Sequence, residues 1–440
     1  MVSRSQRFHA PGWPPGKPVG ELGEFGLIAR LREQVGRAAI GLAPNGGAPV
    51  TDALPDRPEL VGIGDDAAVL RPPAAWDLLL TCDTLVEGRH FRAQWLSARE
   101  LGARAAEVNL SDIAAMGGLP EAALISLGLP PELSVEMIDE IYTGLLDALS
   151  VHGARIIGGN IARTERLHLD VTLMGRVEKG TGLFRRNAKA GDILFVTGHP
   201  GRAGAALAAL SAEESPAGEA AGASIWQRLA EREAFAENLR AEADAAAKAS
   251  ALASSRASPL AAPGASTHAT PGTSPLERSM AEAARERIRR PYAVPRARIE
   301  IARYLLRNGI SECAIDLSDG LAGDAAHLCE ESGVGIVLEE LFLPIHEDLR
   351  HIGELRETDP LVWVLGPSDD YELLFTASPG KADAVFALAG LFGVPVSPLG
   401  SVVAEPGGVR LRHPDGSFSE LAGGWDHLRA GAWPEKDEGE

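Results

Sequence analysis

The stretch VNLSDIAAMG, residues 108–117, is the most informative for the fold. It places two polar residues at fixed positions near the end of an apolar helix. The apolar spacing over 97–116 predicts a helix that ends at Gly117 and Gly118. Asn109 and Asp112 are three residues apart, so they lie on one face near the end of that helix. Because Asp is a poor helix former and is rarely buried unpaired, Asp112 predicts a functional site.

Other short motifs repeat this use of Asp, and several of them directly follow an apolar run. They are Gly62-Ile63-Gly64-Asp65-Asp66, Thr81-Cys82-Asp83-Thr84, Asp316-Leu317-Ser318-Asp319-Gly320 and Ser368-Asp369-Asp370-Tyr371-Glu372. Carboxylates at strand ends destabilise a core, but they are good ligands for the hard cations that accompany polyphosphates. Each motif alone has an ordinary alternative: a glycine turn, an Asx-turn or a helix cap. Together they predict a magnesium-dependent nucleotide enzyme.

Composition sets outer bounds on the function. A chain of 440 residues exceeds one compact core, so two domains are expected. The net charge of −19 argues against nucleic-acid or anionic-membrane partners, and it implies that ATP arrives with its cations. No apolar run is long enough to span a membrane. The three cysteines lack zinc-ligand spacing and fit a reducing cytoplasm.

Apolar periodicity predicts an α/β fold with mixed sheets. The expected strands are 77–82, 122–129, 155–157, 167–177, 192–197, 373–376 and 394–403, and the expected helices are 97–116, 135–149 and 295–308. We expect a disordered tail at 1–20, an amino-terminal ATP- and metal-binding domain at 21–178, and a carboxy-terminal domain at 179–432. A flexible Ala/Ser/Pro-rich insert at 212–285 interrupts the second domain.

Further candidates are weaker when taken singly. Gly158-Gly159-Asn160 is interpreted as a loop whose backbone N–H groups approach phosphate, although it is not a P-loop. Arg185 would neutralise phosphate, and the alternative is a solvated surface arginine. His90 is a possible ligand contact, and Trp425 would either stack on a heteroaromatic ring or pack in the core. No nucleophilic triad is readable, so covalent catalysis has no support.

In this order, the motifs resemble the thiamine-monophosphate kinase family of the aminoimidazole-ribonucleotide synthetase superfamily. The resemblance runs from about residue 21 to 428, outside the insert, and its most specific pieces are TCDTLVEGRHF (81–91) and VNLSDIAAMG (108–117). It implies a two-domain architecture like that of aminoimidazole-ribonucleotide synthetase, with the site in a cleft between α/β domains. It also implies a homodimer that transfers the ATP γ-phosphate to thiamine monophosphate with several Mg²⁺ ions, giving thiamine diphosphate.

The resemblance also assigns residues. The implied metal ligands are Asp66, Thr81, Cys82, Asp83, Asp112, Asn160, Asp316 and Asp319. The implied ATP contacts are Tyr142, Gly159, Asn160, Arg185 and Ser318, and the implied substrate contacts are His90, Asp369 and Trp425. No side chain is expected to act as a covalent or acid–base catalyst.

Three positions depart from the family pattern. Asn160 stands where the family often has Asp, Cys82 replaces a Thr, and Asp369 replaces a Glu. These changes affect one metal position and the substrate contact. Two other interpretations stay open: another ATP-using enzyme of the superfamily, and a non-catalytic nucleotide-binding relative.

Overall fold

The computed structural model describes residues 74–213 and 275–421, with the backbone alone for 275–278. It also describes Gln227, Arg228 and five residues between Leu27 and Gln34, all of them helical. Asp66, Trp425, the tail at 1–20 and most of the predicted insert lie outside the described residues.

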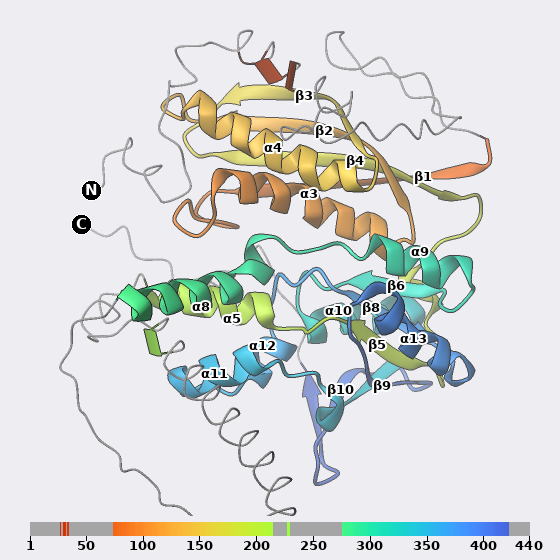
Figure 1. Ribbon diagram of the computed structural model, residues 1–440. Coiled ribbons are helices and arrows are strands. Elements are labelled where there is room, and N and C mark those ends of the chain that lie inside the picture. Colours follow the sequence, from red (N-terminus) through yellow and green to blue (C-terminus); the bar gives the residue numbers. More distant parts are fainter. Residues whose placement is uncertain are drawn as a thin grey trace, which may run out of the picture.

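The described strands of the amino-terminal half form one mixed four-stranded sheet in the order β1-β4-β2-β3. Its strands are β1 (Trp76–Val86), β2 (Leu119–Leu129), β3 (Arg155–Arg163) and β4 (His168–Glu178). β4 pairs antiparallel with both β1 and β2, while β2 and β3 are parallel. Helices α3 (Ala98–Ala115) and α4 (Val135–Val151) cover one face of this sheet (Figure 1).

Local sequence explains these elements. Ser97 and Glu100 form a reciprocal capping box at the start of α3, which ends at Met116, as the spacing predicts. In β4, every second residue is buried, which confirms the alternation seen in the sequence. Residues of β1 alternate in the same way, so Thr81 and Asp83 face the helices while Cys82 faces the opposite side.

The second group of described strands forms a seven-stranded sheet in the order β11-β10-β7-β9-β5-β8-β6. Its strands are β5 (Ile193–Thr197), β6 (Cys313–Asp316), β7 (Gly335–Glu339), β8 (Leu373–Ala377), β9 (Val396–Val403), β10 (Gly408–Arg412) and β11 (Phe418–Leu421). The accompanying helices are α5 (Arg202–Glu213), α8 (Pro275–Ala293), α9 (Ile299–Arg307), α10 (Leu321–Ser332), α11 (Glu347–Arg356), α12 (Leu361–Leu365) and α13 (Ala382–Phe392). The α/β prediction with two mixed sheets is therefore confirmed.

Three expected boundaries were wrong. β1 continues to Val86, so the TCDT motif lies inside the strand and not at its end. β3 continues to Arg163, so Gly158-Gly159-Asn160 is strand and not loop. The segment predicted as insert up to 285 overlaps α8, which begins at Pro275 and buries Ala281 and Ala284.

The two sheets meet through helices. α8 and α9 lie between the upper and lower halves of the molecule, next to α3 (Figure 1). From α9, Arg303 donates to Gly117 O at 2.7 Å and pairs with Glu178 at 2.6 Å. From α8, Arg289 pairs with Glu100 of α3 at 2.6 Å. Ion pairs therefore fix the position of the first half on the second. None of the described helices has the length and apolar character that crossing a membrane requires.

Candidate active site

β1 and α3 bring together two carboxylates that are far apart in sequence. Thr81 Oγ1 donates to the Asp112 carboxylate. Asp83 lies two residues further along the same face of β1, and its backbone N–H donates to Asn109 Oδ1 at 3.2 Å. Asp83 and Asp112 are close enough for the charge of Asp112 to raise the pKa of Asp83. The structure therefore brings Asp83 and Asp112 together, whereas Asp66, a third implied metal ligand, lies outside the described residues.

The second domain adds Asp316, the last residue of β6. Its side chain is only 3% exposed, and it accepts a hydrogen bond from Ser111 Oγ of α3 at 2.9 Å. The NLSD motif of 109–112 and the DLSD motif of 316–319 therefore meet between the two sheets.

The loop after Asp316 turns sharply into α10. Gly320 has a φ of +96°, and an added Cβ would lie 2.0 Å from Gly366 O, so only glycine fits there. Gly320, and not Asp316 or Asp319, occupies the N-cap position of α10, and it makes no side-chain hydrogen bond there. The Asp319 N–H instead donates to Asp324 Oδ2 at 3.1 Å, and Ser318 lies partly exposed in the same loop.

Burial and mutual repulsion perturb these acids. Burial, followed by the charge of Asp112, raises the pKa of Asp83 to about 7. Burial and Asp112 also raise the pKa of Asp316 to about 7, and burial raises that of Asp112 despite the hydrogen bond from Thr81. Burial with the charges of Asp316 and Asp319 raises the pKa of Asp324 to about 8. The site concentrates negative charge that the protein itself does not neutralise.

Arg185 supplies the nearby positive charge. It lies in the 3₁₀ turn η2 (Arg185–Asn187), where its carbonyl accepts from Ser332 Oγ at 2.6 Å. The side chain is exposed, yet its charge lowers the pKa of both Asp112 and Asp316. An exposed guanidinium beside a carboxylate cluster is suitably placed to bind phosphate oxygens.

The donor set suits a hard cation. All its side-chain donors are oxygens, from Thr81, Asp83, Asp112 and Asp316. Within the described ranges, no three acidic, His or Cys side chains converge closely enough to hold a metal ion alone. Mg²⁺ typically uses one or two carboxylates and takes its other ligands from water and substrate phosphates. The neighbouring carboxylates of Asp83 and Asp112 fit that mode.

A second group of predicted residues lies nearby on a shared scaffold. His90 accepts from Val86 N through Nδ1 at 3.0 Å, and its carbonyl accepts from the Tyr292 hydroxyl at 2.8 Å. Asp369 pairs with Arg104 of α3 at 2.9 Å. The Arg104 guanidinium lies 4.3 Å from the centre of the Tyr292 ring. His90 and Asp369 are therefore connected through Tyr292 and Arg104.

Two predicted metal ligands lie on the opposite side of the sheet from the cluster. Cys82 is exposed, accepts from Thr172 Oγ1 at 3.4 Å, and points away from Thr81 and Asp83 because successive strand residues alternate. Asn160 is exposed on β3 and shares that outer face. Placing both residues in the carboxylate cluster of the same subunit was wrong.

The prediction that Gly159 belongs to a phosphate loop was also wrong. Gly159 pairs with Ile125 of β2, and an added Cβ would lie 1.9 Å from Ile125 O. The close approach of β2 to β3 explains why a glycine occupies position 159. Tyr142 lies on α4 within the hydrophobic core and is 5% exposed, so little of it is accessible to a nucleotide.

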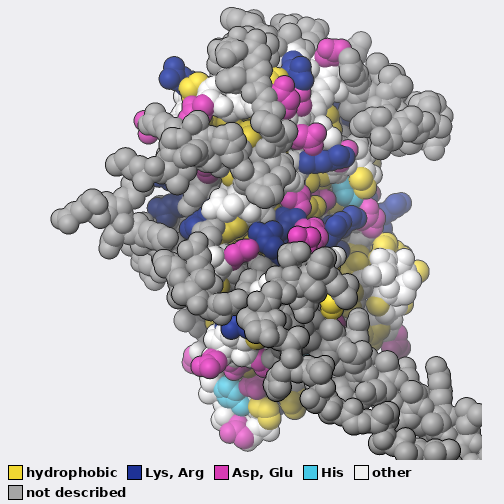
Figure 2. Space-filling view, turned by 60° about the vertical axis from the view of Figure 1, so that its left-hand side comes forward, with side chains coloured by type: hydrophobic (Ala, Val, Ile, Leu, Met, Phe, Trp, Pro, Cys, Tyr) yellow, Lys and Arg dark blue, Asp and Glu magenta, His cyan; other side chains and the backbone are white. Residues whose placement is uncertain are grey.

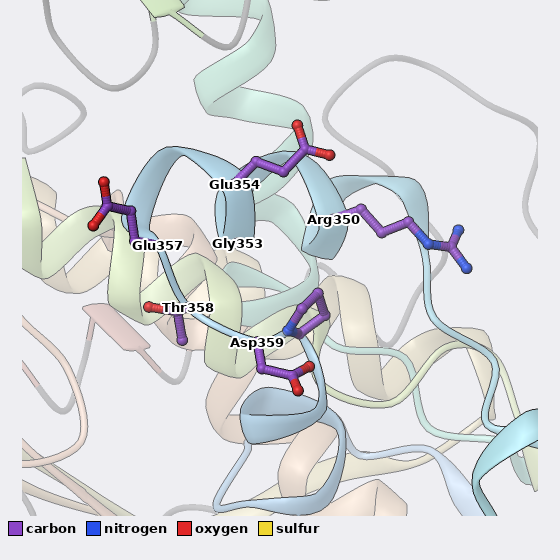
Figure 3. A pocket seen from close by; sticks show the side chains of 7 residues that line it. Arg350, Gly353, Glu354, Glu357, Thr358 and Asp359 are labelled. Atoms are coloured by element: carbon purple, nitrogen blue, oxygen red, sulfur yellow. The ribbon is translucent and has the colours of Figure 1, made fainter. Parts of the chain in front are cut away.

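Two further surface features of the molecule are a belt of mixed charge and a shallow pocket. Figure 2 shows Lys and Arg intermixed with Asp and Glu across the middle of one face, so that face carries no single-sign patch. A shallow pocket lies at the end of α11 (Figure 3), between Arg350, Glu354, Glu357 and the turn to Pro360. None of the predicted site residues lines this pocket.

Sequence reasoning missed several residues of the site region. Ser111 and Asn109 were quoted in the motif without a role, and Arg104, Tyr292 and Asp324 carried no motif at all. The available signal for Arg104 was its position seven residues before Ser111, which places both on one face of a buried helix. Asp370 instead accepts from Gly201 N and Ala203 N at the start of α5, at 2.5 and 2.9 Å, which is a capping role.

With this geometry established, comparison with known proteins defines the family. Residues 64–177 match the AIR synthase related protein, N-terminal domain, and residues 272–412 match its C-terminal domain. The chain belongs to this AIR synthase related family, as its resemblance predicts.

Similar proteins within the family include thiamine-monophosphate kinases. The enzyme of Aquifex aeolicus is 29% identical over 81% of this chain and 86% of its own length. The crystal structure of the enzyme from Stenotrophomonas maltophilia K279a is 29% identical, with a TM-score of 0.63 over 91% of this chain and 98% of that chain. A structure described as AaThiL complexed with AMPPCP and TMP is 26% identical, with a TM-score of 0.58 over 93% and 98% of the two chains.

Proposed function

We propose that this enzyme transfers the γ-phosphate of ATP to thiamine monophosphate, giving thiamine diphosphate, with Mg²⁺ as the required cation. The observation that carries the proposal is the group of Asp83, Asp112 and Asp316 between the two domains, which have no ion-pair partner among the described residues, with Arg185 close enough to act on the pKa of Asp112 and Asp316. Phosphoryl transfer depends on positioning and charge neutralisation, and it requires no protein nucleophile.

Each part of the site has a proposed task. Asp83, Asp112, Thr81 and Asp316, together with Asp66 and Asp319, would hold Mg²⁺, which neutralises charge on the transferred phosphoryl group. Arg185 binds the phosphate oxygens of ATP, and Ser318 on the loop after β6 adds a further contact to the nucleotide. His90, Asp369 and Trp425 form the acceptor pocket. The anchored His90 ring and the Arg-paired Asp369 carboxylate support preorganisation of that pocket.

The outer face of the first sheet supports a homodimer. Leu80 of β1 is 69% exposed, Leu78 is 42% exposed, and Leu124 of β2 is 40% exposed on the same face. Such an apolar face favours association with a second copy. Because Cys82 and Asn160 lie on this face, any metal or nucleotide contact they make would be across that interface. Light scattering should show a dimer, and Leu80→Glu should yield a monomer.

We further place the reaction in the cytoplasm, where Mg²⁺ and ATP are abundant. Cys82, Cys313 and Cys329 are all free thiols, which agrees with a reducing compartment.

One assay tests the central proposal. Purified protein is incubated with ATP, thiamine monophosphate and MgCl₂, and thiamine diphosphate is detected by mass spectrometry. Product that requires all three components supports the proposal. ATP hydrolysis that ignores thiamine monophosphate would instead indicate another ATP-using enzyme of the superfamily, and nucleotide binding without turnover would indicate a non-catalytic relative.

A further inference from the structure

Arg104 is a buried arginine that the proposed mechanism does not use. It is 1% exposed, and its Nη2 donates to Asp369 Oδ2 at 2.9 Å while Nη1 donates to the Tyr292 carbonyl. The guanidinium lies 4.3 Å from the centre of the Tyr292 ring and 5.6 Å from that of Tyr371. Its Nε–H has no hydrogen-bond partner within the described part of the chain. Burying a guanidinium in this way is costly, so stability alone does not account for it.

The position of Arg104 on α3 links the two halves of the site. Arg104 and Ser111 are seven residues apart, which is about two helical turns, so both side chains project toward the second domain. Ser111 holds Asp316 at the end of β6, and Arg104 holds Asp369 just before β8. β6 and β8 are adjacent antiparallel strands, with Asp316 opposite Leu373. One helix therefore orients a proposed cation ligand and a proposed acceptor contact.

Two tyrosines complete this arrangement. The Tyr292 hydroxyl donates to the carbonyl of His90, so the residue that stacks on Arg104 also anchors the segment carrying His90. Tyr371 has a φ of +52°, a strained value for a non-glycine residue, and its N–H donates to Leu317 O in the loop after β6. Strain of this kind persists where surrounding contacts fix the backbone, and it is concentrated at functional sites.

The Asp369 side chain faces two environments. Arg104 binds one carboxylate oxygen from the buried side, while the side chain as a whole is 33% exposed. The carboxylate is therefore held in one orientation and still accessible from the solvent side. A cationic aromatic acceptor is the chemical class that such an oriented, accessible carboxylate would recognise.

We propose that Arg104 is a positioning residue that fixes Asp369, Tyr292 and Tyr371 as one rigid wall of the acceptor pocket and thereby sets specificity for the acceptor. This inference rests on the proposed kinase function. Arg104 contacts no substrate itself, because it is almost fully buried. Its effect should appear in recognition of thiamine monophosphate and leave recognition of ATP unchanged.

The test compares Arg104→Met, Arg104→Lys and Asp369→Asn in steady-state kinetics with both substrates. Arg104→Met should raise the KM for thiamine monophosphate at least about tenfold and leave the KM for ATP within about twofold. Arg104→Lys should recover part of the loss, because Lys keeps the charge but lacks the planar fork and the stacking. The double variant Arg104→Met/Asp369→Asn should have a KM for thiamine monophosphate no higher than that of the more affected single variant, because both changes act on the same carboxylate, that of Asp369.

Arg289→Met is the matched control. Arg289 is also buried at the domain interface, at 7% exposure, where it pairs with Glu100 and Glu286. The Arg289→Met variant should have a lower melting temperature than the wild type and an unchanged ratio of the KM for thiamine monophosphate to the KM for ATP. If Arg104→Met does not fold, Arg104→Lys and Asp369→Asn still test the selective effect on the acceptor.

The outcomes separate this inference from the proposed function. If the wild-type protein forms no thiamine diphosphate, the proposed function and this inference both fail. If the wild type is active but the Arg104 variants change both KM values equally, or neither, the positioning role alone is overturned. Additive effects in the double variant would overturn it as well.

Discussion

Two sets of acidic side chains lie between the two domains, and they differ in what neutralises them. Glu100, Glu178, Asp369 and Glu372 each pair with an arginine. Asp83, Asp112 and Asp316 form no ion pair within the part of the chain that the structure describes. Burial acts on both sets, so the difference lies in the partner that each set has.

The pKa values express this difference. Burial would raise the pKa of Glu100, but hydrogen bonds from Arg289 lower it, and a hydrogen bond from Arg303 lowers the pKa of Glu178. Burial raises the pKa of Asp83 and of Asp316 to about 7. Glu100, Glu178 and Asp369 pair across the two domains and Glu372 pairs within the second, whereas the unpaired acids are arranged for a cation that arrives with the substrate.

The largest effect should come from the unpaired set. Asp112→Asn removes one carboxylate of the Asp83–Asp112 pair, so activity should fall at least about 100-fold, consistent with several kcal/mol of lost charge stabilisation. The melting temperature without Mg²⁺ should stay equal or rise, because the change relieves repulsion between buried acids. Turnover at several Mg²⁺ concentrations and differential scanning fluorimetry measure the two effects. Undiminished turnover at limiting Mg²⁺ would remove Asp112 from the cation site.

Breaking an ion pair of the paired set should instead lower the stability of the fold. Arg298 Nε donates to Glu372 Oε2 at 2.6 Å, and Thr197 Oγ1 donates to the same oxygen at 2.6 Å. Arg298→Met leaves Glu372 buried without its cation, so the free energy of unfolding should fall by roughly 3–5 kcal/mol. Urea denaturation measures this loss.

The matched double variant is Arg298→Met/Glu372→Gln, which removes both charges. It should be more stable than Arg298→Met alone, because no charge is left buried without a partner. A double variant that loses the sum of the two single effects would show that the pairing does not govern this site.

The contrast between the two sets could be predicted only in part from sequence. The helix over 97–116 and the strand over 167–177 followed from strong apolar periodicity, and the resemblance implied that Asp83 and Asp112 belong to one set of ligands. The pairing partners could not be predicted, because Arg104 and Arg298 contact residues more than seventy positions away in the chain. Such contacts depend on the packing of whole domains, which local patterns do not encode.

Local rules also led to two errors with a physical explanation. Gly158-Gly159-Asn160 has the composition of a turn, but the approach of Ile125 O requires glycine at 159 within a strand. Cys82 was grouped with its neighbours Thr81 and Asp83 by family pattern, whereas the alternation of β1 places it on the other face. Asp66 and Trp425 lie outside the described residues, so their roles stay predictions.

Glu107 of α3 belongs to neither set, and changing it should have a smaller, pH-dependent effect on the free energy of unfolding. It accepts from Ala297 N at 2.8 Å, and burial raises its pKa from 4.5 to about 7, despite Arg296 and Arg298 nearby. A raised carboxyl pKa destabilises the fold as pH increases from the unfolded value through the folded value. Glu107→Gln should therefore add roughly 1–3 kcal/mol to the free energy of unfolding at pH 8.5 and little at pH 4. Equal effects at both pH values would exclude this origin.

The smallest effect should come from an ion pair outside the domain junction. Lys189 Nζ lies 2.6 Å from Glu312 Oε2, but both side chains are more than 60% exposed, at 65% and 61%. Water screens such a pair and each side chain loses rotamer freedom in forming it, so Lys189→Met should leave the free energy of unfolding almost unchanged. Urea denaturation at low and at high salt measures this, beside Arg298→Met as the buried reference. Should Lys189→Met destabilise as strongly as Arg298→Met, burial would not be what separates strong from weak pairs in this molecule. If Lys189→Met and the wild type unfold with nearly equal free energy at both salt concentrations, the exposed pair contributes little. Ion pairs would then stabilise this molecule mainly at the buried junction, where the unpaired acids also lie.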